Sequence, residues 1–235
     1  MRFGRIKIVS NPLKHWAKET ARQVGKHLSR AGYEITAKGA SLTICVGGDG
    51  TILFANHKKR IEGAVLGIGS EKSFICQLTR ENWRKGLLPM LRKGETEPRQ
   101  MLSASSAGKT YTAINDFVIH SKDYRIIELD VRMKGKNNWF EADGIIVSTA
   151  TGSYAYAFSA GGKHLPLPSK KIVVVPICPY KRRFRPSFLS NGAKIGIRVN
   201  RESGFIVDGI FIRNVKAGET VTVRAGKTMM FMKRQ

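Results

Sequence analysis

Residues 42–51, LTICVGGDGT, constrain the fold of this chain more than any other stretch. Among the first five residues, Leu42, Ile44 and Val46 are apolar and partly β-branched, which predicts a short buried strand. Three glycines around Asp49 follow, and Ile52, Leu53 and Phe54 then predict a helix. Because glycine has no Cβ, a phosphate can approach the backbone N–H groups of such a loop, and the positive end of the helix dipole favours the same charge.

Asp49 is an unexpected residue in a loop that attracts phosphate, because its carboxylate repels the anion. A general base that accepts a proton, or a ligand of a metal ion, explains a carboxylate at this point. The structural alternative is a tight turn from strand to helix in which Asp49 caps the helix. The stretch alone leaves these interpretations open.

The chain carries 41 basic and 17 acidic residues, a formal net charge of +24, and the excess is spread over both halves. Such a surface attracts polyanions through counterion release. Nucleic acid stays open as a partner but is disfavoured, since the chain has no helix-turn-helix signature, aromatic-glycine RNA motif or zinc-finger spacing. A generally solvated Lys/Arg surface, and a positive field that speeds the capture of small polyanionic substrates, are the other interpretations.

Three cysteines, Cys45, Cys76 and Cys178, stand apart in apolar surroundings. They predict buried free thiols rather than a disulfide framework or a zinc site. No apolar run approaches the roughly 20 residues that span a bilayer, and no signal peptide opens the sequence. We therefore expect a cytoplasmic protein that does not associate with membranes.

The first part of the chain alternates predicted strands and helices, which is typical of an open, mostly parallel α/β sheet with its ligand beyond the carboxyl ends of the strands. Strands are expected at residues 5–10, 33–36, 42–46 and 64–68, and helices at 14–31, 52–59 and 81–93. Polar residues 94–99 predict a crossover, so the α/β domain covers residues 1–98. Residues 99–235 predict a β-rich domain, in which 153–160 form the one expected helix.

A second long motif lies at residues 143–162, DGIIVSTATGSYAYAFSAGG. Together with GGDGT and Asn115-Asp116, it resembles the NAD kinase family, whose pattern is GGDGT, then Asn-Glu, then DGxxxSTPTGSTAYxxSAGG in the same order. A GGDG loop alone also occurs in diacylglycerol, sphingosine and 6-phosphofructo kinases. The second motif is long and specific, and the resemblance extends over about residues 42–190.

The resemblance implies an α/β domain followed by a β-rich, NAD-binding domain, with the last residues returning to the first domain. It implies transfer of a phosphoryl group from ATP or inorganic polyphosphate to the 2′-hydroxyl of the adenosine ribose of NAD, which gives NADP. It also implies a homo-oligomer, either a dimer or a tetramer. Mg2+ or another divalent cation is expected from the reaction class, held by substrate phosphates and water, because no protein-only metal site is visible.

The same resemblance assigns roles to individual residues. Asp49 matches the proton acceptor, and Gly47, Gly48, Gly50 and Thr51 match the cradle of the donor phosphates. The positions that match NAD contacts are Asp49, Gly50, Phe74, Asn115, Asp116, Arg125, Asp143, Thr149, Thr151, Gly152, Ser153, Tyr154, Ala155, Tyr156 and Ser159.

Several residues depart from the family pattern. Residues 70–78 lack most of the glycines of the corresponding segment, Asp116 replaces Glu, Tyr154 replaces Thr and Ile210 replaces Gln. Two rivals to an NAD kinase stay open. One is a GGDG-type kinase that acts on another alcohol, such as a lipid or a sugar, because the GGDG loop is shared, although the second motif disfavours it. The other is a catalytically impaired relative that binds NAD or nucleic acid, because of the departures at 70–78, 154 and 210.

Overall fold

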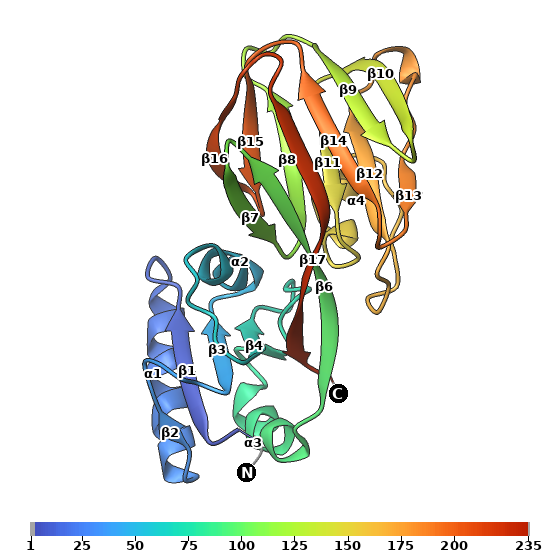
Figure 1. The fold of residues 1–235 in the computed structure, drawn as a ribbon. Helices are drawn as coiled ribbons and strands as arrows, with labels where there is room; N and C mark the ends of the chain where they lie inside the picture. The colour runs from blue at the N-terminus through green and yellow to red at the C-terminus, as the bar shows by residue number, and fades with distance from the viewer. Residues whose placement is uncertain (1–2, 235) are drawn as a thin grey trace. The chain divides into compact units, whose positions relative to one another are not determined.

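The structure is a computed structural model that describes residues 3–234 and divides into two compact units. The first unit runs to Pro98 and includes the C-terminal residues from Met229, whereas Arg99–Thr228 form the second. Strands β6 (Thr96–Ser106) and β17 (Thr220–Met232) each continue from one unit into the other (Figure 1).

The first unit is built around a parallel sheet of order β2-β1-β3-β4, and both β5 and the end of β17 pair with β4. Helices α1 and α3 bury apolar side chains in one core cluster with these strands. Its elements are β1 (Arg5–Ser10), α1 (His15–Arg30), β2 (Glu34–Ile35), β3 (Leu42–Val46), α2 (Asp49–His57), β4 (Ala64–Gly69), β5 (Leu78–Thr79) and α3 (Trp83–Lys93).

The central strands β3 and β4 are buried along their whole length, which explains why their sequences read as continuous apolar runs. Helix α1 ends at Arg30, and Gly32 follows with φ +84°, a left-handed conformation that glycine adopts without strain. Helix α2 begins at Asp49, three residues earlier than expected, so Asp49 lies in the first turn of the helix.

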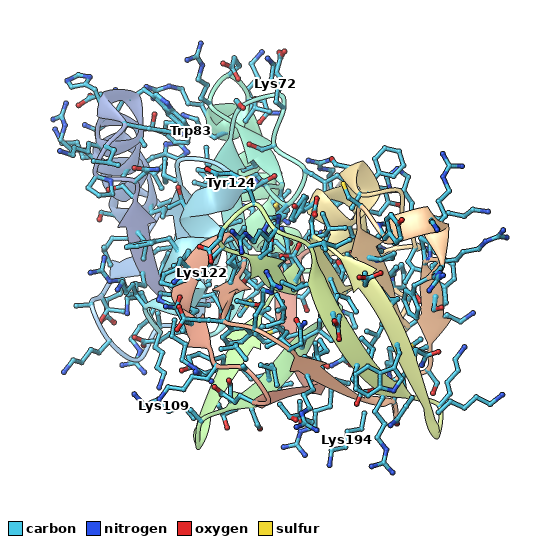
Figure 2. All side chains as sticks on the ribbon, turned by 90° about the horizontal axis from the view of Figure 1, so that it is seen from above. Lys72, Trp83, Lys109, Lys122, Tyr124 and Lys194 are labelled. Carbon is cyan, nitrogen blue, oxygen red and sulfur yellow. The ribbon has the colours of Figure 1, made fainter. Side chains whose placement is uncertain are left out.

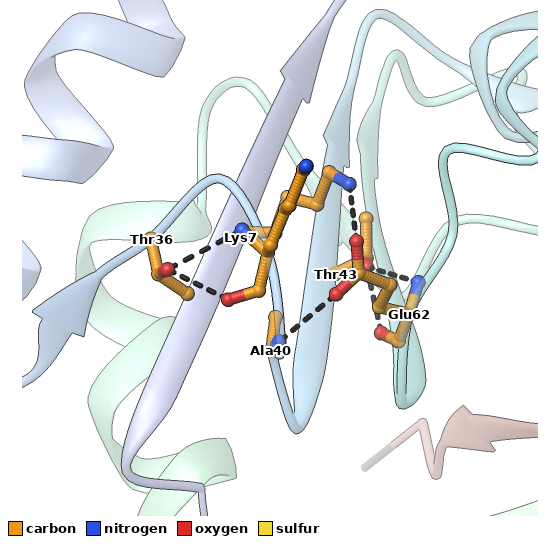
Figure 3. A network of polar contacts seen from close by, with 6 residues as sticks. Lys7, Thr36, Ala40, Thr43 and Glu62 are labelled. Carbon is orange, nitrogen blue, oxygen red and sulfur yellow. Dashed lines mark hydrogen bonds and ion pairs between the residues drawn. The ribbon is translucent and has the colours of Figure 1, made fainter.

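Glu62 ties the amino-terminal ends of the sheet strands together (Figure 3). Its carboxylate accepts hydrogen bonds from Lys7 Nζ at 2.6 Å and from the Ala40 N–H at 3.1 Å. Its own backbone donates to Thr43 Oγ1 at 2.9 Å, and that hydroxyl donates back to the Glu62 carbonyl at 2.7 Å. The Lys7 ammonium, followed by the Ala40 amide, lowers the pKa of Glu62. This network links β1, β3 and the loop that precedes β4.

The second unit contains two antiparallel sheets, of orders β10-β9-β14-β17-β6-β7 and β13-β12-β11-β8-β15-β16. Its other elements are β7 (Lys109–Ala113), β8 (Asp116–Ser121), β9 (Ile127–Met133), β10 (Lys136–Ala142), β11 (Gly144–Ser148), η1 (Gly152–Tyr154), α4 (Tyr156–Ser159), β12 (Ile172–Ile177), η2 (Tyr180–Arg182), β13 (Ser187–Leu189), β14 (Lys194–Val199), β15 (Ser203–Val207) and β16 (Ile210–Val215).

One large core cluster takes buried side chains from both sheets of this unit. In β9 the buried residues are Ile127, Leu129, Val131 and Met133, and the residues between them face solvent to varying degrees. An α/β part followed by a β-rich part is the fold predicted from the sequence, and the structure confirms it. Within residues 3–234 the helices are all too short or too polar to cross a membrane.

Two local expectations are wrong. Residues 153–160 do not form one helix: the short 3-10 helix η1 and helix α4 are separated at Ala155, whose φ of −110° and ψ of −127° are not helical. Cys178 is exposed, whereas Cys45 and Cys76 are buried as expected. Cys178 follows the last residue of β12 and has φ +46°, so the chain turns outward there.

Candidate active site

The glycine loop joins β3 to α2 in the first unit. Gly47 and Gly48 have φ +140° and +94°, which side chains rarely adopt, and a Cβ on Gly47 would collide with Thr51 Oγ1 and Asn11 Cβ. The N–H groups of Gly47 and Gly48 both donate to the Ile68 carbonyl, at 2.9 and 3.2 Å. These two amides therefore hold the loop against β4.

The first turn of α2 supplies the remaining amides. The Thr51 N–H donates to the Gly48 carbonyl at 2.9 Å, and the Thr51 side chain is buried. The N–H groups at the start of a helix have no acceptor within the helix. Within residues 3–234, the amides of Asp49 and Gly50 have no acceptor outside the helix either. These two amides, at the positive end of the helix dipole, are the ones that can bind an anion.

The Asp49 carboxylate is half-buried and holds the segment that follows β4. Its Oδ2 accepts the Phe74 N–H at 2.7 Å, and its Oδ1 accepts the N–H groups of Ile75 and Cys76 at 3.0 and 3.2 Å. Oδ2 thus accepts one of these three amides and Oδ1 accepts two, and the Cys76 thiol also hydrogen-bonds to the carboxylate. Burial, and next the Asp49 charge, raises the pKa of the Cys76 thiol, which therefore stays protonated beside the carboxylate.

A hollow of about 210 Å3 opens over this loop. Lys14, Lys72 and Arg80 bring positive charge to its wall, and Lys14 Nζ donates to the Gly47 carbonyl at 2.9 Å. Arg80 also forms an ion pair with Glu81. The residues that line the hollow are Lys14, Trp16, Gly47, Gly48, Asp49, Gly50, Ser70, Lys72, Ser73 and Arg80.

Sequence reasoning missed the three cations of this hollow. They come from the turn after β1, the segment after β4 and the residue after β5, so only the parallel sheet brings them to one edge. The one available signal was the altered segment 70–78, where Lys72 stands among residues that replace family glycines.

In the second unit, Asp208 organises the residues around Asn115. Its carboxylate accepts the N–H groups of Ile114 at 2.9 Å, Asn115 at 2.7 Å and Asp116 at 3.1 Å. Asp208 is buried in a turn with φ +49°, directly before Gly209. Three consecutive amides on one carboxylate fix the backbone at the start of β8, so Asp208 positions Asn115 and Asp116. In the sequence, only the glycine that follows Asp208 marks this position as a turn.

Asp116 and Asp208 form a buried acidic pair. Burial, and next the charge of Asp208, raises the pKa of Asp116 to about 7. Burial raises the pKa of Asp208 to about 6, although its three amide donors work in the opposite direction. The folded chain therefore holds protons on this pair that the unfolded chain, with ordinary values near 4, has already released.

A pH dependence of stability follows from this pair. Because the folded pKa values are raised, the folded state is destabilised as the pH increases from about 4 to about 7. We expect Asp116→Asn to remove much of this slope and to gain on the order of 2 kcal/mol over the parent at pH 8 relative to pH 5. Urea unfolding of both proteins at the two pH values measures the difference, and parallel pH profiles would contradict it.

The segment 149–153 packs against Asn115. The Thr149 N–H donates to the Asn115 carbonyl at 2.9 Å, and Thr149 Oγ1 donates to the Ile114 carbonyl at 2.7 Å. A Cβ on Gly152 would collide with the Asn115 carbonyl, so this approach requires glycine. Ser153 Oγ donates to the Ala150 carbonyl at 2.7 Å. The hydroxyls of Thr149 and Ser153 are therefore engaged by the backbone and hold the segment in place.

Two tyrosines follow this segment. Tyr154 stacks on His164, with ring centroids 4.2 Å apart, and Phe158 stacks on the same imidazole at 4.0 Å. Tyr156 is 42% exposed. Burial, and then the nearby Cys178, Asp116 and Asp143, raises the pKa of Tyr156. Tyr156 therefore lies within electrostatic range of both acids. Asp116 pairs with Ser148 at one end of β11, whereas Asp143 precedes Gly144 at the other end, so the structure does not bring Asp143 next to the Asn115-Asp116 pair.

The remaining residues predicted from the sequence are either exposed or lie in other segments of the chain. Arg125 is exposed in the loop between β8 and β9, and Ser159 is exposed at the end of α4. Phe74 belongs to the first unit, where its N–H binds Asp49, and Ala155 is the break between η1 and α4. The described residues contain no group of three or more His, Cys, Asp or Glu side chains that could hold a metal ion.

A parallel α/β unit with a GGDG loop, followed by a β-rich unit, defines a phosphate-handling kinase of the GGDG type. Residues 114–233 match the model of the ATP-NAD kinase C-terminal domain. The NAD kinase of Chlorobaculum tepidum is 33% identical over 193 residues, which are 77% of this chain and 67% of that protein. The NAD kinase of Chlorobium luteolum is 32% identical over 216 residues, 87% of this chain and 75% of that protein. The chain belongs to the NAD kinase family.

Solved structures agree on the fold. An NAD kinase from Archaeoglobus fulgidus, crystallised in complex with ATP, superposes with a TM-score of 0.85 at 24% identity, over 98% of this chain and 94% of that chain. Yeast NADH kinase complexed with NADH gives a TM-score of 0.89 at 19% identity, over 100% of this chain and 84% of that one. The family resemblance and the fold class predicted from the sequence are confirmed, and the chain is a kinase.

Proposed function

We propose that this chain phosphorylates the 2′-hydroxyl of the adenosine ribose of NAD and so produces NADP, with ATP or inorganic polyphosphate as the phosphoryl donor. Family membership supports the reaction. The single structural observation that carries it is the Asp49 carboxylate, held by three loop amides at the edge of a cationic hollow. A lipid or sugar acceptor is disfavoured by the long match to NAD kinases.

Each part of the site has a role in this proposal. Asp49 Oδ2 accepts the proton of the 2′-hydroxyl and orients its oxygen toward the donor. The free amides of Asp49 and Gly50, together with Lys14 and Lys72, bind the donor phosphates and neutralise their charge. Asn115, Asp116, Asp143 and residues 149–156 hold NAD, with Tyr156 as the exposed ring.

A divalent cation fits this hollow. The hydroxyls of Ser70 and Ser73 line it and are oxygen ligands, and donor phosphates and water would complete the shell of Mg2+. Bound there, Mg2+ supplies neutralisation of charge on the donor oxygens. We further propose that the enzyme works in the cytoplasm as a homo-oligomer, either a dimer or a tetramer.

A grid of donors and acceptors tests the reaction. NADP formation is measured with ATP or polyphosphate against NAD or NADH, with diacylglycerol and sugar phosphates as competing alcohols. We expect NADP from NAD with at least one of the two donors. Transfer only to a lipid or a sugar would establish the rival kinase, and ligand binding without transfer would establish the impaired relative.

Removing two cations from the hollow tests donor binding. We expect Lys14→Gln combined with Lys72→Gln to raise the KM for the donor at least about tenfold, since a charge-assisted contact contributes roughly 1.5–3 kcal/mol. The KM for NAD should change much less. Lys26→Gln with Lys109→Gln is the matched control, because both residues are exposed and lie outside the hollow. If both pairs of substitutions raised the KM for the donor equally, the donor would be attracted by the overall positive charge of the protein and not bound by the cations of the hollow.

A further inference from the structure

One end of the outer face of the β9–β14–β17 sheet gathers positive charge. The strand pairing places Arg132 opposite Gly196 and Lys194 opposite Arg224. Lys134 follows directly after β9 in the turn to β10. All four cations are exposed, and Figure 2 labels Lys194. We call these four residues, Arg132, Lys134, Lys194 and Arg224, the basic face.

A hollow of about 420 Å3 lies on this face. Gly196 lies among its lining residues, where a Cβ would meet Arg132 Cβ at 3.7 Å and Thr220 Cγ2 at 3.8 Å. Glycine therefore leaves depth between neighbouring strands, and threonine hydroxyls supply additional donors. The lining residues are Arg132, Met133, Gly135, Lys194, Gly196, Thr220 and Thr222.

The charge on the basic face is not balanced by the protein. Within residues 3–234, none of its four cations forms an ion pair with an acidic side chain. The neighbouring acid on the same sheet face, Asp130, stands opposite Arg198. Like charges directly across a strand pair, such as Lys194 and Arg224, destabilise a sheet. A bound anion would relieve this repulsion.

The chemistry of the face selects the kind of anion. No aromatic side chain lines the hollow, and Trp139 lies in another hollow with the acids Glu128 and Asp130, so nucleobases find no stacking surface at the basic face. A second copy of the chain would bring the same cations and be repelled. Adjacent strands lie about 4.8 Å apart, so cations on β9 and β17 are spread over roughly 10 Å, more than one phosphate group covers.

We propose that the basic face binds a linear chain of inorganic polyphosphate, through residues other than those of the glycine loop. This inference goes beyond the proposed NADP synthesis and does not depend on it, because binding is measured without turnover. A polyphosphate chain has the right charge density, needs no base recognition and can contact all four cations at once.

Fluorescence anisotropy with end-labelled, long-chain inorganic polyphosphate tests the site over a series of salt concentrations. We expect Lys194→Gln combined with Arg224→Gln to weaken binding about tenfold or more and to reduce the salt slope by about two. The control pair Lys26→Gln and Lys109→Gln removes the same charge elsewhere and should change the affinity less than about twofold. The same comparison in the Lys14→Gln, Lys72→Gln background removes any contribution of chains bound at the glycine loop.

Three results would overturn the inference. Equal weakening by both pairs of substitutions would mean diffuse attraction to a basic surface. Tighter binding of single-stranded RNA than of polyphosphate, weakened by Lys194→Gln with Arg224→Gln, would make the face a nucleic-acid site. For the third result, orthophosphate is added at the same concentration of phosphate groups as the polyphosphate contains. Complete displacement of polyphosphate under that condition would indicate that the face binds single anions rather than a chain. Both substituted side chains are exposed, and circular dichroism of the variant checks that the fold is intact.

Discussion

Asp49→Asn is expected to lower the kcat of NADP formation by about 10² to 10⁴, with a much smaller change in the KM for NAD and donor. A positioned general base contributes a factor of this size, and the Asn amide cannot accept the proton of the 2′-hydroxyl. The substitution also affects the loop, because the Asp49 carboxylate accepts the N–H groups of Phe74, Ile75 and Cys76. Steady-state kinetics and calorimetric binding of NAD separate the loss of chemistry from the loss of binding.

Glu71→Gln is the matched control for this experiment. Glu71 is an exposed carboxylate in the same segment and does not line the hollow, so its substitution makes the same change of charge without touching the proposed base. We expect it to retain nearly the activity of the parent. An Asp49→Asn enzyme as active as the parent would assign Asp49 a purely structural role, as the capping residue of the 74–76 backbone.

Asp208→Ala is expected to release the backbone of residues 114–116 and to destabilise the second unit by about 3 kcal/mol. The substitution leaves three buried N–H groups without their acceptor, and each such loss costs roughly 1–3 kcal/mol. Relief of the repulsion between Asp208 and Asp116 offsets part of this cost. Hydrogen exchange measured on the peptide that contains residues 114–116 should accelerate roughly a hundredfold.

Two variants frame this result. Asp208→Asn keeps one acceptor oxygen, so its exchange rates should fall between those of the parent and Asp208→Ala. Asp123→Ala removes an exposed carboxylate from the same unit and should leave exchange at 114–116 unchanged. Protection of these amides in Asp208→Ala equal to that in the parent would show that Asp208 does not position Asn115 and Asp116.

The parts of this molecule that the sequence predicts well are those set by local pattern. The apolar run of β3 and the glycines that follow it specify a buried strand and a turn with positive φ, and both are present. The alternation in β9 specifies one buried face, because side chains of a strand point to opposite sides in turn. The family pattern singled out residues 149–156 of the second motif as one functional segment. The structure adds that Thr149 and Gly152 of this segment pack against the Asn115 backbone.

The parts that the sequence could not predict depend on contacts between distant segments. Asp208 binds amides more than 90 positions earlier in the chain, and nothing local to Asp208 marks that partner. The Ile68 carbonyl takes up the amides of Gly47 and Gly48, which a pattern of glycines alone suggests are free. The break at Ala155 appears among small residues that are compatible with a continuous helix. In each case, contacts between segments distant in the sequence override the local conformational propensity.

The most direct test of the account is a crystal structure of the enzyme with NAD and an unreactive donor analogue. Proton transfer to Asp49 requires the 2′-oxygen of the adenosine ribose within hydrogen-bond distance of Asp49 Oδ2, about 2.6–3.2 Å, with the donor phosphates on the amides of Asp49 and Gly50. We expect that arrangement. NAD bound with its 2′-hydroxyl turned away from Asp49, while the crystals still convert NAD to NADP, would contradict it.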